Sequence, residues 1–101
     1  MARQIVWSPA SKNDLEKILD YLEAHWGNKI VSVFITKIDN TISLIANTPQ
    51  IFPVINKELE IRKCVITKQN TLYYRESNQK VEIVRLFDSR QDPKKLAFLE
   101  P

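Results

Sequence analysis

The chain of 101 residues contains a single glycine, Gly27, and this glycine separates two long stretches with helical periodicity. In the first stretch, apolar residues recur at the three- and four-residue spacing of an amphipathic helix. These residues are Leu15, Ile18, Leu19, Leu22 and Trp26. Because glycine readily adopts the left-handed conformation that closes many helices, we predict that the first helix ends at Gly27 and that a tight helical hairpin follows.

The second helix has its own apolar stripe and a clear end. The stripe consists of Ile30, Val33, Phe34, Ile38, Thr41, Ile42 and Ile45. Thr48 precedes Pro49 and is therefore disfavoured in the helical conformation, so the helix should stop there. The first helix has an equally clear start, with Ser8 as side-chain cap and Pro9 at the first helical position. Residues 5–7 form a short apolar strand before it.

The C-terminal half has the pattern of a β-sheet. Residues 49–58 contain two prolines and read as an irregular connection. Three strands are then predicted, at residues 59–66, 71–76 and 81–87. The short polar turns between them imply an antiparallel meander, and Asp92-Pro93 could cap a last short helix that runs to Leu99. We predict an α+β fold in which the N-terminal strand and the meander form one sheet with the helical hairpin on one face.

Length and composition limit the kinds of site that the chain can build. At 101 residues we expect one domain, residues 1–101, with one core. Cys64 is the only cysteine and His25 the only histidine, so we expect no internal disulfide, no metal and no cofactor. Cys64 should be a small buried apolar side chain. We find no signal core and no uninterrupted apolar run that would span a bilayer, and we expect a cytoplasmic protein without a membrane partner.

Charge is distributed unevenly along the chain. Residues 1–50 carry five basic and five acidic side chains, whereas residues 51–101 carry ten and seven. The whole excess of +3 therefore lies in the second half. A basic half suits an acidic partner or a phosphate backbone, although it is also consistent with a solvated surface.

Several short motifs, in this order, resemble the RelE/ParE family of bacterial toxins over essentially the whole chain. They are Trp7-Ser8-Pro9-Ala10, Asp14-Leu15, Ile18 with Tyr21-Leu22, Ile61-Arg62, Tyr73-Tyr74-Arg75, and Arg90 with Asp92-Pro93. The resemblance implies the toxin of a type II toxin–antitoxin pair that is neutralised by a cognate antitoxin. It leaves two targets open, because RelE-like members cut messenger RNA on the ribosome and ParE-like members inhibit DNA gyrase.

The residues that the resemblance assigns to RNA cleavage are incomplete in this chain. Arg62 falls at the first catalytic lysine of RelE-like enzymes and Arg90 at an arginine near the end of the last strand. Cys64, Thr71 and Leu96 fall at a second lysine, an arginine and a tyrosine. RNA cleavage needs cations for the transition state and a proton donor, and each missing donor costs on the order of 10²-fold in rate. We therefore favour a ParE-like, non-catalytic inhibitor of gyrase.

Other readings of these residues stay open. An RNA endonuclease would use Arg62 and Arg90 as catalytic residues, with help from Glu60 or Tyr74. A catalytically degenerate binding module is a third reading. Arg62 could instead brace the sheet by pairing with a carboxylate such as Glu60, Glu82 or Asp88. Arg75 and Arg85 could simply face solvent.

Two binding surfaces are predicted. For the target, the resemblance and the position beyond the last strand favour Arg90, Lys94 and Lys95, because a loop there can reach a partner. For the antitoxin, the resemblance implies that its C-terminal segment lies as a helix or strand in an apolar groove near the hairpin. The candidate contacts are Leu19, Leu22, Trp26, Val31 and Ile35. The alternatives are that Leu19 and Leu22 belong wholly to the core and that Trp7 and Trp26 seal the hairpin against the sheet.

Overall fold

The structure, a computed structural model, describes residues 2–91, 93–96 and 99. The elements in chain order are β1 (Gln4–Trp7), α1 (Pro9–Trp26), α2 (Asn28–Asn47), the 3₁₀ helix η1 (Pro49–Ile51), β2 (Val54–Asn56), β3 (Ile61–Val65), β4 (Asn70–Ser77), β5 (Lys80–Asp88) and the 3₁₀ helix η2 (Pro93–Leu96). The predicted succession of a strand, two helices and a meander is confirmed.

The sheet has five strands in the order β1-β5-β4-β3-β2. The antiparallel meander of β3, β4 and β5 is as predicted. Two features differ from the sequence prediction. β1 pairs with β5 in parallel, so the sheet is mixed. The connection at residues 49–58 also contains the short strand β2, which pairs with β3 at the edge and is interrupted by a register shift.

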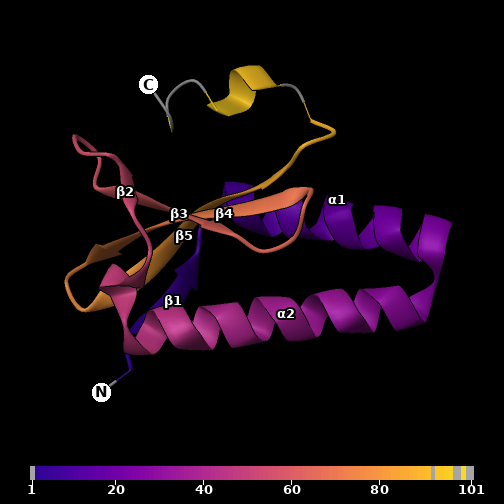
Figure 1. Cartoon of the computed structure of the whole chain (residues 1–101), viewed down its shortest axis with the longest axis horizontal. Helices are drawn as coiled ribbons and strands as arrows, with labels where there is room; N and C mark the ends of the chain where they lie inside the picture. The colour runs from indigo at the N-terminus through magenta and orange to yellow at the C-terminus, as the bar shows by residue number, and fades with distance from the viewer. Residues whose placement is uncertain (1, 92, 97–98, 100–101) are drawn as a thin grey trace.

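The sheet is covered on both faces, whereas the sequence predicted cover on one (Figure 1). The helical hairpin packs on one face and buries the main core, which includes Phe34, Ile38, Leu72 and Ile83. The C-terminal segment, yellow in Figure 1, crosses the other face and contributes to a second, smaller core. Ile61, Tyr73 and Leu99 are its fully buried members. The predicted last helix is a single 3₁₀ turn, and Asp92 lies outside the described residues.

The start of α1 is tied to the sheet by its cap. The Ser8 hydroxyl accepts the backbone N–H of Ser11 at 3.0 Å and donates to the carbonyl of Val84 at 2.8 Å. That carbonyl belongs to a bulge in β5, because Tyr73 pairs with Arg85 while Tyr74 pairs with Ile83, which leaves Val84 as the extra residue. The Ser8 hydroxyl thus provides a hydrogen-bond partner for a backbone N–H at the helix end and for a backbone carbonyl in the bulge.

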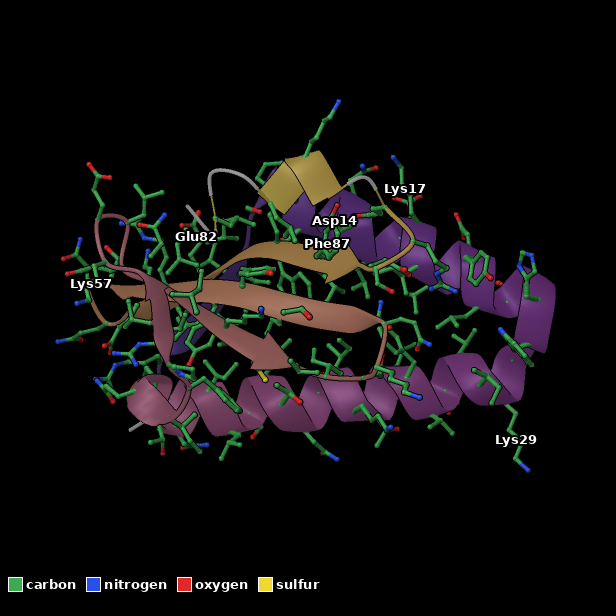
Figure 2. All side chains as sticks on the ribbon, turned by 45° about the horizontal axis from the view of Figure 1, so that its top comes forward. Asp14, Lys17, Lys29, Lys57, Glu82 and Phe87 are labelled. Carbon is green, nitrogen blue, oxygen red and sulfur yellow. The ribbon has the colours of Figure 1, made fainter. Side chains whose placement is uncertain are left out.

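Asp14 makes a second attachment nearly two turns further along α1. Its carboxylate accepts both Nε and Nη2 of Arg85, at 2.7 and 2.8 Å, and the backbone N–H of Leu86 at 3.0 Å. Asp14 is buried, and Figure 2 labels it where α1 meets β5. The reading of Arg85 as a solvent-facing strand residue is therefore wrong. Together with Ser8, this ion pair fixes α1 on β5.

Gly27 joins the two helices directly. Its φ of 84° confirms a positive value, but its ψ of 177° lies far from the left-handed helical region that we predicted. This extended conformation at positive φ is essentially restricted to glycine. It reverses the chain in one residue, so α2 begins at Asn28 immediately after α1.

The second helix is unusually apolar. By length and hydropathy alone, α2 resembles a membrane-spanning helix, and it is the one such helix in the described part of the chain. The core helices of soluble proteins share this property. Phe34, Ile38 and Ile45 of α2 are buried in the main core. Other large apolar residues of α2, among them Ile30, Val33 and Leu44, are exposed.

Candidate functional site

A groove of about 650 Å³ opens between the tip of the helical hairpin and the far end of the sheet. Its helical wall is mostly apolar and is formed by Tyr21, Leu22, Trp26, Ile30, Val33, Phe34 and Lys37. Its opposite wall is polar and comes from the turn between β3 and β4 and from the residues after β5. That wall consists of Thr67, Gln69, Asn70, Ser89 and Arg90. The groove can therefore accommodate an amphipathic segment, with cations available on both walls.

Arg90 is held at this groove by two contacts. Its Nε donates to Asp88 at 2.7 Å, and Nη2 makes a second, very close contact with the same carboxylate. The centre of the guanidinium lies 3.9 Å from the centroid of the Tyr21 ring, which is the geometry of a cation–π interaction. Chiefly because Asp88 accepts these hydrogen bonds, the pKa of Arg90 is raised above its ordinary value.

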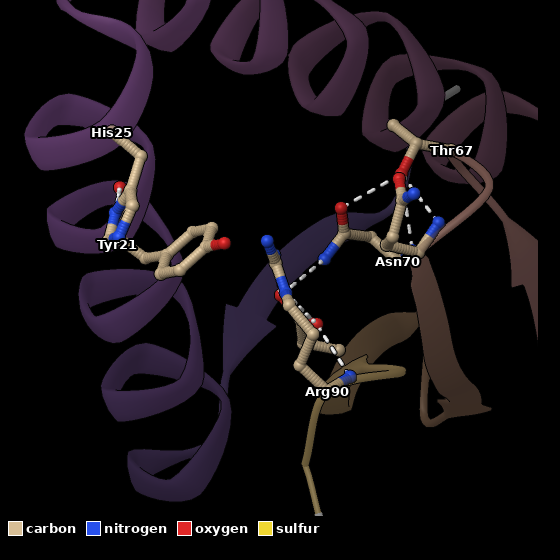
Figure 3. A network of polar contacts seen from close by, with 7 residues as sticks. Tyr21, His25, Thr67, Asn70 and Arg90 are labelled. Atoms are coloured by element: carbon tan, nitrogen blue, oxygen red, sulfur yellow. Dashed lines mark hydrogen bonds and ion pairs between the residues drawn. The ribbon is translucent and has the colours of Figure 1, made fainter.

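The partners of Arg90 are themselves anchored (Figure 3). Nδ2 of Asn70 reaches Asp88 at 3.4 Å, and the Thr67 hydroxyl donates to Oδ1 of Asn70 at 2.8 Å. Burial alone would raise the pKa of Asp88, but the hydrogen bonds and charge of Arg90 outweigh it and hold the pKa below its ordinary value. This polar chain connects the turn between β3 and β4 with the end of β5.

A second, smaller cavity of about 400 Å³ lies between the two helices and β1. Its lining is apolar except for one carboxylate, and comprises Ile5, Trp7, Leu15, Leu19, Ile35, Ile38, Asp39 and Ile42. Of the predicted target-binding side chains that the structure describes, neither Arg90 nor Lys94 lines it.

The five candidate antitoxin contacts are divided between these two places. Leu22 and Trp26 line the larger groove, and Leu19 and Ile35 line the smaller cavity. Val31 is partly buried and lines neither of them. Trp26 is 66% exposed, so the reading in which it seals the hairpin against the sheet is wrong. All five were predicted to form one surface on the hairpin, but residues on different sides of the helices line different cavities.

Arg62 lies at the other end of the sheet from Arg90. Its Nη1 donates to the carbonyls of Phe52 at 2.7 Å and Gln50 at 3.3 Å. It therefore braces the connection before β3 through backbone carbonyls, rather than through a carboxylate as we had considered. In the sheet register, Arg62 faces Tyr74, whereas Asn70, which contacts Asp88, is four residues away along β4. The structure does not bring Arg62 and Arg90 together.

Of the other groups considered for chemistry, two are buried and one is exposed. Tyr74 is fully buried and donates its hydroxyl to the carbonyl of Pro49 at 2.8 Å. Cys64 is also buried, as predicted, and burial raises the pKa of its thiol to about 11. Glu60 is exposed in the turn before β3, with a positive φ of 57°.

The C-terminal lysines are only partly described. Lys94 is exposed on η2, and the side chain of Lys95 lies outside the description. Sequence reasoning missed Tyr21, Asn70 and Asp88 as partners of the site. Tyr21-Leu22 had been noted only as a family motif, and nothing in its spacing indicated a contact with Arg90.

A mixed sheet with a helical hairpin on one face is the fold of RelE/ParE-like toxins. The family model described as "ParE toxin of type II toxin-antitoxin system, parDE" matches residues 5–93. The chain therefore belongs to the ParE toxin family. A search of curated proteins found no match.

Solved structures show the same fold at low sequence identity. A chain of the chromosomal ParDE system from P. aeruginosa is 13% identical, has a TM-score of 0.72, and aligns over 86% of this chain and 96% of its own. The YoeB/ParE toxin from Agrobacterium tumefaciens is 18% identical, with a TM-score of 0.62 over 84% and 96%. A chain of the E. coli DinJ-YafQ complex is 12% identical, with a TM-score of 0.60 over 89% and 96%.

Proposed function

We propose that this chain is a ParE-like toxin that acts in the cytoplasm, inhibits DNA gyrase by binding to it, and is neutralised by a cognate antitoxin. Membership of the ParE family supports this target over the ribosome. The observation that carries the proposal is the separation of the two arginines that RNA cleavage would require together.

Cleavage of RNA by its own 2′-hydroxyl needs cations and a proton donor within reach of one phosphate. Four residues along β4 correspond to about 13 Å between the row of the sheet that holds Arg62 and the row that holds Asp88, which anchors Arg90. Arg62 is engaged by two carbonyls, and the buried Tyr74 hydroxyl is engaged by a third. These groups cannot act on one phosphate without rearrangement of the sheet, whereas inhibition by binding needs no such assembly.

For the target surface we propose Arg90 with Lys94 and Lys95. Arg90 is exposed and follows the end of β5, and Lys94 is exposed on η2. A cationic surface on a connecting segment suits an acidic patch of a protein target, because opposite potentials guide the encounter and fix its orientation.

For the antitoxin we propose that the larger groove receives an amphipathic segment, with Leu22 and Trp26 as contacts. Exposed large aromatic residues at the centre of an apolar patch often dominate binding energy. Lys37 and Arg90 on the two walls favour a segment that carries carboxylates. Leu19 and Ile35 stay proposed contacts for a second part of the same partner, in the smaller cavity.

The target is tested by two assays with the purified chain. We expect inhibition of supercoiling by gyrase and no position-specific cleavage of messenger RNA on ribosomes. Arg90→Ala should weaken inhibition, and Lys57→Ala is the matched control, because this exposed lysine lies at the opposite end of the molecule (Figure 2). Cleavage of messenger RNA with gyrase unaffected would reject the proposal in favour of the nuclease.

A further inference from the structure

The orientation of the Arg90 side chain needs an explanation, because an ordinary surface arginine is poorly oriented. It follows the end of β5 by two residues and is exposed. A free arginine side chain samples many rotamers, and a partner that binds it must restrict them at a cost in affinity. What fixes the guanidinium before binding therefore matters for the strength of binding.

Asp88 fixes one edge of the guanidinium. The ion pair uses Nε and Nη2, which leaves the Nη1 amino group outside it. Asp88 also accepts the backbone N–H of Arg90 at 2.9 Å, so both residues belong to one tight turn at the end of the strand. A pair within such a short segment can still swing as a unit relative to the helical wall of the groove.

Tyr21 supplies the contact across the groove, from a helix that is remote in sequence. Its ring lies 3.9 Å from the guanidinium centre and stacks on the His25 imidazole, with ring centroids 4.1 Å apart and planes at 25°. Nδ1 of His25 lies 2.8 Å from the carbonyl of Tyr21, which can only accept, so Nδ1 carries the proton of this hydrogen bond. The ring is thus oriented by α1 before any partner arrives.

We propose that Tyr21 is a positioning residue for Arg90. The Tyr21 ring holds the Arg90 guanidinium against α1, so that Nη1 is presented to the partner in a fixed orientation. This inference rests on the proposed role of Arg90 in binding the target. It assigns Tyr21 no contact with the target of its own. The cation–π contact uses the aromatic face, and the Tyr21 hydroxyl also interacts with the guanidinium. Phenylalanine keeps the aromatic face and should therefore retain the position of the guanidinium, whereas leucine should not.

The first test uses the isolated chain and needs no partner. An aromatic ring displaces the NMR signals of protons above its face to higher field. We expect this displacement for the Arg90 Hδ protons in the wild type and in Tyr21→Phe, and its loss in Tyr21→Leu. Thermal denaturation of each variant checks that folding is intact. Unchanged Arg90 signals in Tyr21→Leu would overturn the proposal, because a residue that only stabilises the fold would leave them in place.

The second test measures inhibition of gyrase supercoiling. An exposed cation–π contact corresponds to about a 2- to 5-fold change in an equilibrium constant, so Tyr21→Leu should require roughly that much more toxin for half-inhibition. Tyr21→Phe should restore the wild-type value. Equal potency of all three proteins would overturn the positioning role while leaving the gyrase proposal intact. If the wild type does not inhibit gyrase, the proposed function fails, and the NMR comparison alone decides the role of Tyr21.

Discussion

Asp14 in α1 and Arg85 in β5 are 71 positions apart in the sequence, and they form a bidentate ion pair with distances of 2.7 and 2.8 Å. The Asp14 side chain is 3% exposed and also accepts the backbone N–H of Leu86. Such a pair does more to specify where α1 sits than to add stability, because desolvation offsets much of the attraction.

Removal of the Asp14 carboxylate should therefore be much more harmful than loss of an exposed pair. Asp14→Ala leaves the Arg85 charge and the Leu86 N–H without their partner, and we expect a loss of about 3 kcal/mol in the free energy of unfolding. Glu82→Ala is the control, because its 4.0 Å pair with Arg75 is partly exposed and too long for a hydrogen bond, so it should contribute within about 1 kcal/mol. Urea denaturation measures both, and equal losses would contradict the assignment.

The Asp88 carboxylate should show a pH-dependent contribution to stability. Its pKa in the folded chain is lowered by Arg90. The contribution is therefore fully present above the unfolded-state pKa of about 4 and is lost as the pH falls through the lower folded value. Arg90→Ala should raise the pKa of Asp88, as measured by the titration of its carboxyl carbon in NMR spectra. If the pKa of Asp88 is the same in Arg90→Ala as in the wild type, Arg90 is not the cause of its lowered value.

The Cys64 thiol should be unreactive in the native protein. Burial raises its pKa to about 11, so little thiolate exists at pH 8. We expect a thiol reagent such as dithionitrobenzoate to react fully in guanidinium chloride and only slowly under native conditions. Fast stoichiometric reaction of the native protein would show that β3 opens far more readily than its burial indicates.

Gly27 should resist replacement for reasons of backbone geometry alone. A Cβ atom added there meets nothing within 4 Å, but φ is +84° with ψ at 177°. Gly27→Ala should therefore lower stability by about 1–3 kcal/mol, through strain and not through a clash. Thermal denaturation checks the loss. A variant as stable as the wild type would mean that the hairpin closes through another conformation.

Trp26 offers a direct signal for occupation of the larger groove. Because this side chain is 66% exposed, Trp26→Ala should change the free energy of unfolding by no more than about 0.5 kcal/mol. In a Trp7→Phe background, Trp26 is the single tryptophan, and its fluorescence should shift to shorter wavelength when the cognate antitoxin binds. Binding with no spectral change would place the antitoxin elsewhere.

The parts of the fold that could be predicted are those in which neighbouring residues determine the local structure. Ser8-Pro9 marks the start of α1, and the apolar stripes mark both helices, because capping and amphipathic periodicity act within a few residues. The meander followed from the short polar turns. β2 was missed because three residues between turns carry no alternation that could be distinguished from a loop.

The parts that could not be predicted depend on residues distant in the sequence. The parallel pairing of β1 with β5 and the contact between Tyr21 and Arg90 arise only when the helical hairpin has folded onto the sheet. Arg90 was selected from its position after the last strand, but its anchor, Asp88, was considered only as a possible partner of Arg62. The bulge at Val84 had no local signal either.

That bulge determines how β5 can change over evolution. Before it, the inward residues are Val81 and Ile83, and after it they are Leu86 and Asp88, so the strand changes from odd to even positions at the extra residue. Deletion of Val84 would reverse the facing of everything beyond it and turn the carboxylate that holds Arg90 outward. We therefore expect homologous strands to tolerate substitution of Val84 but not its deletion.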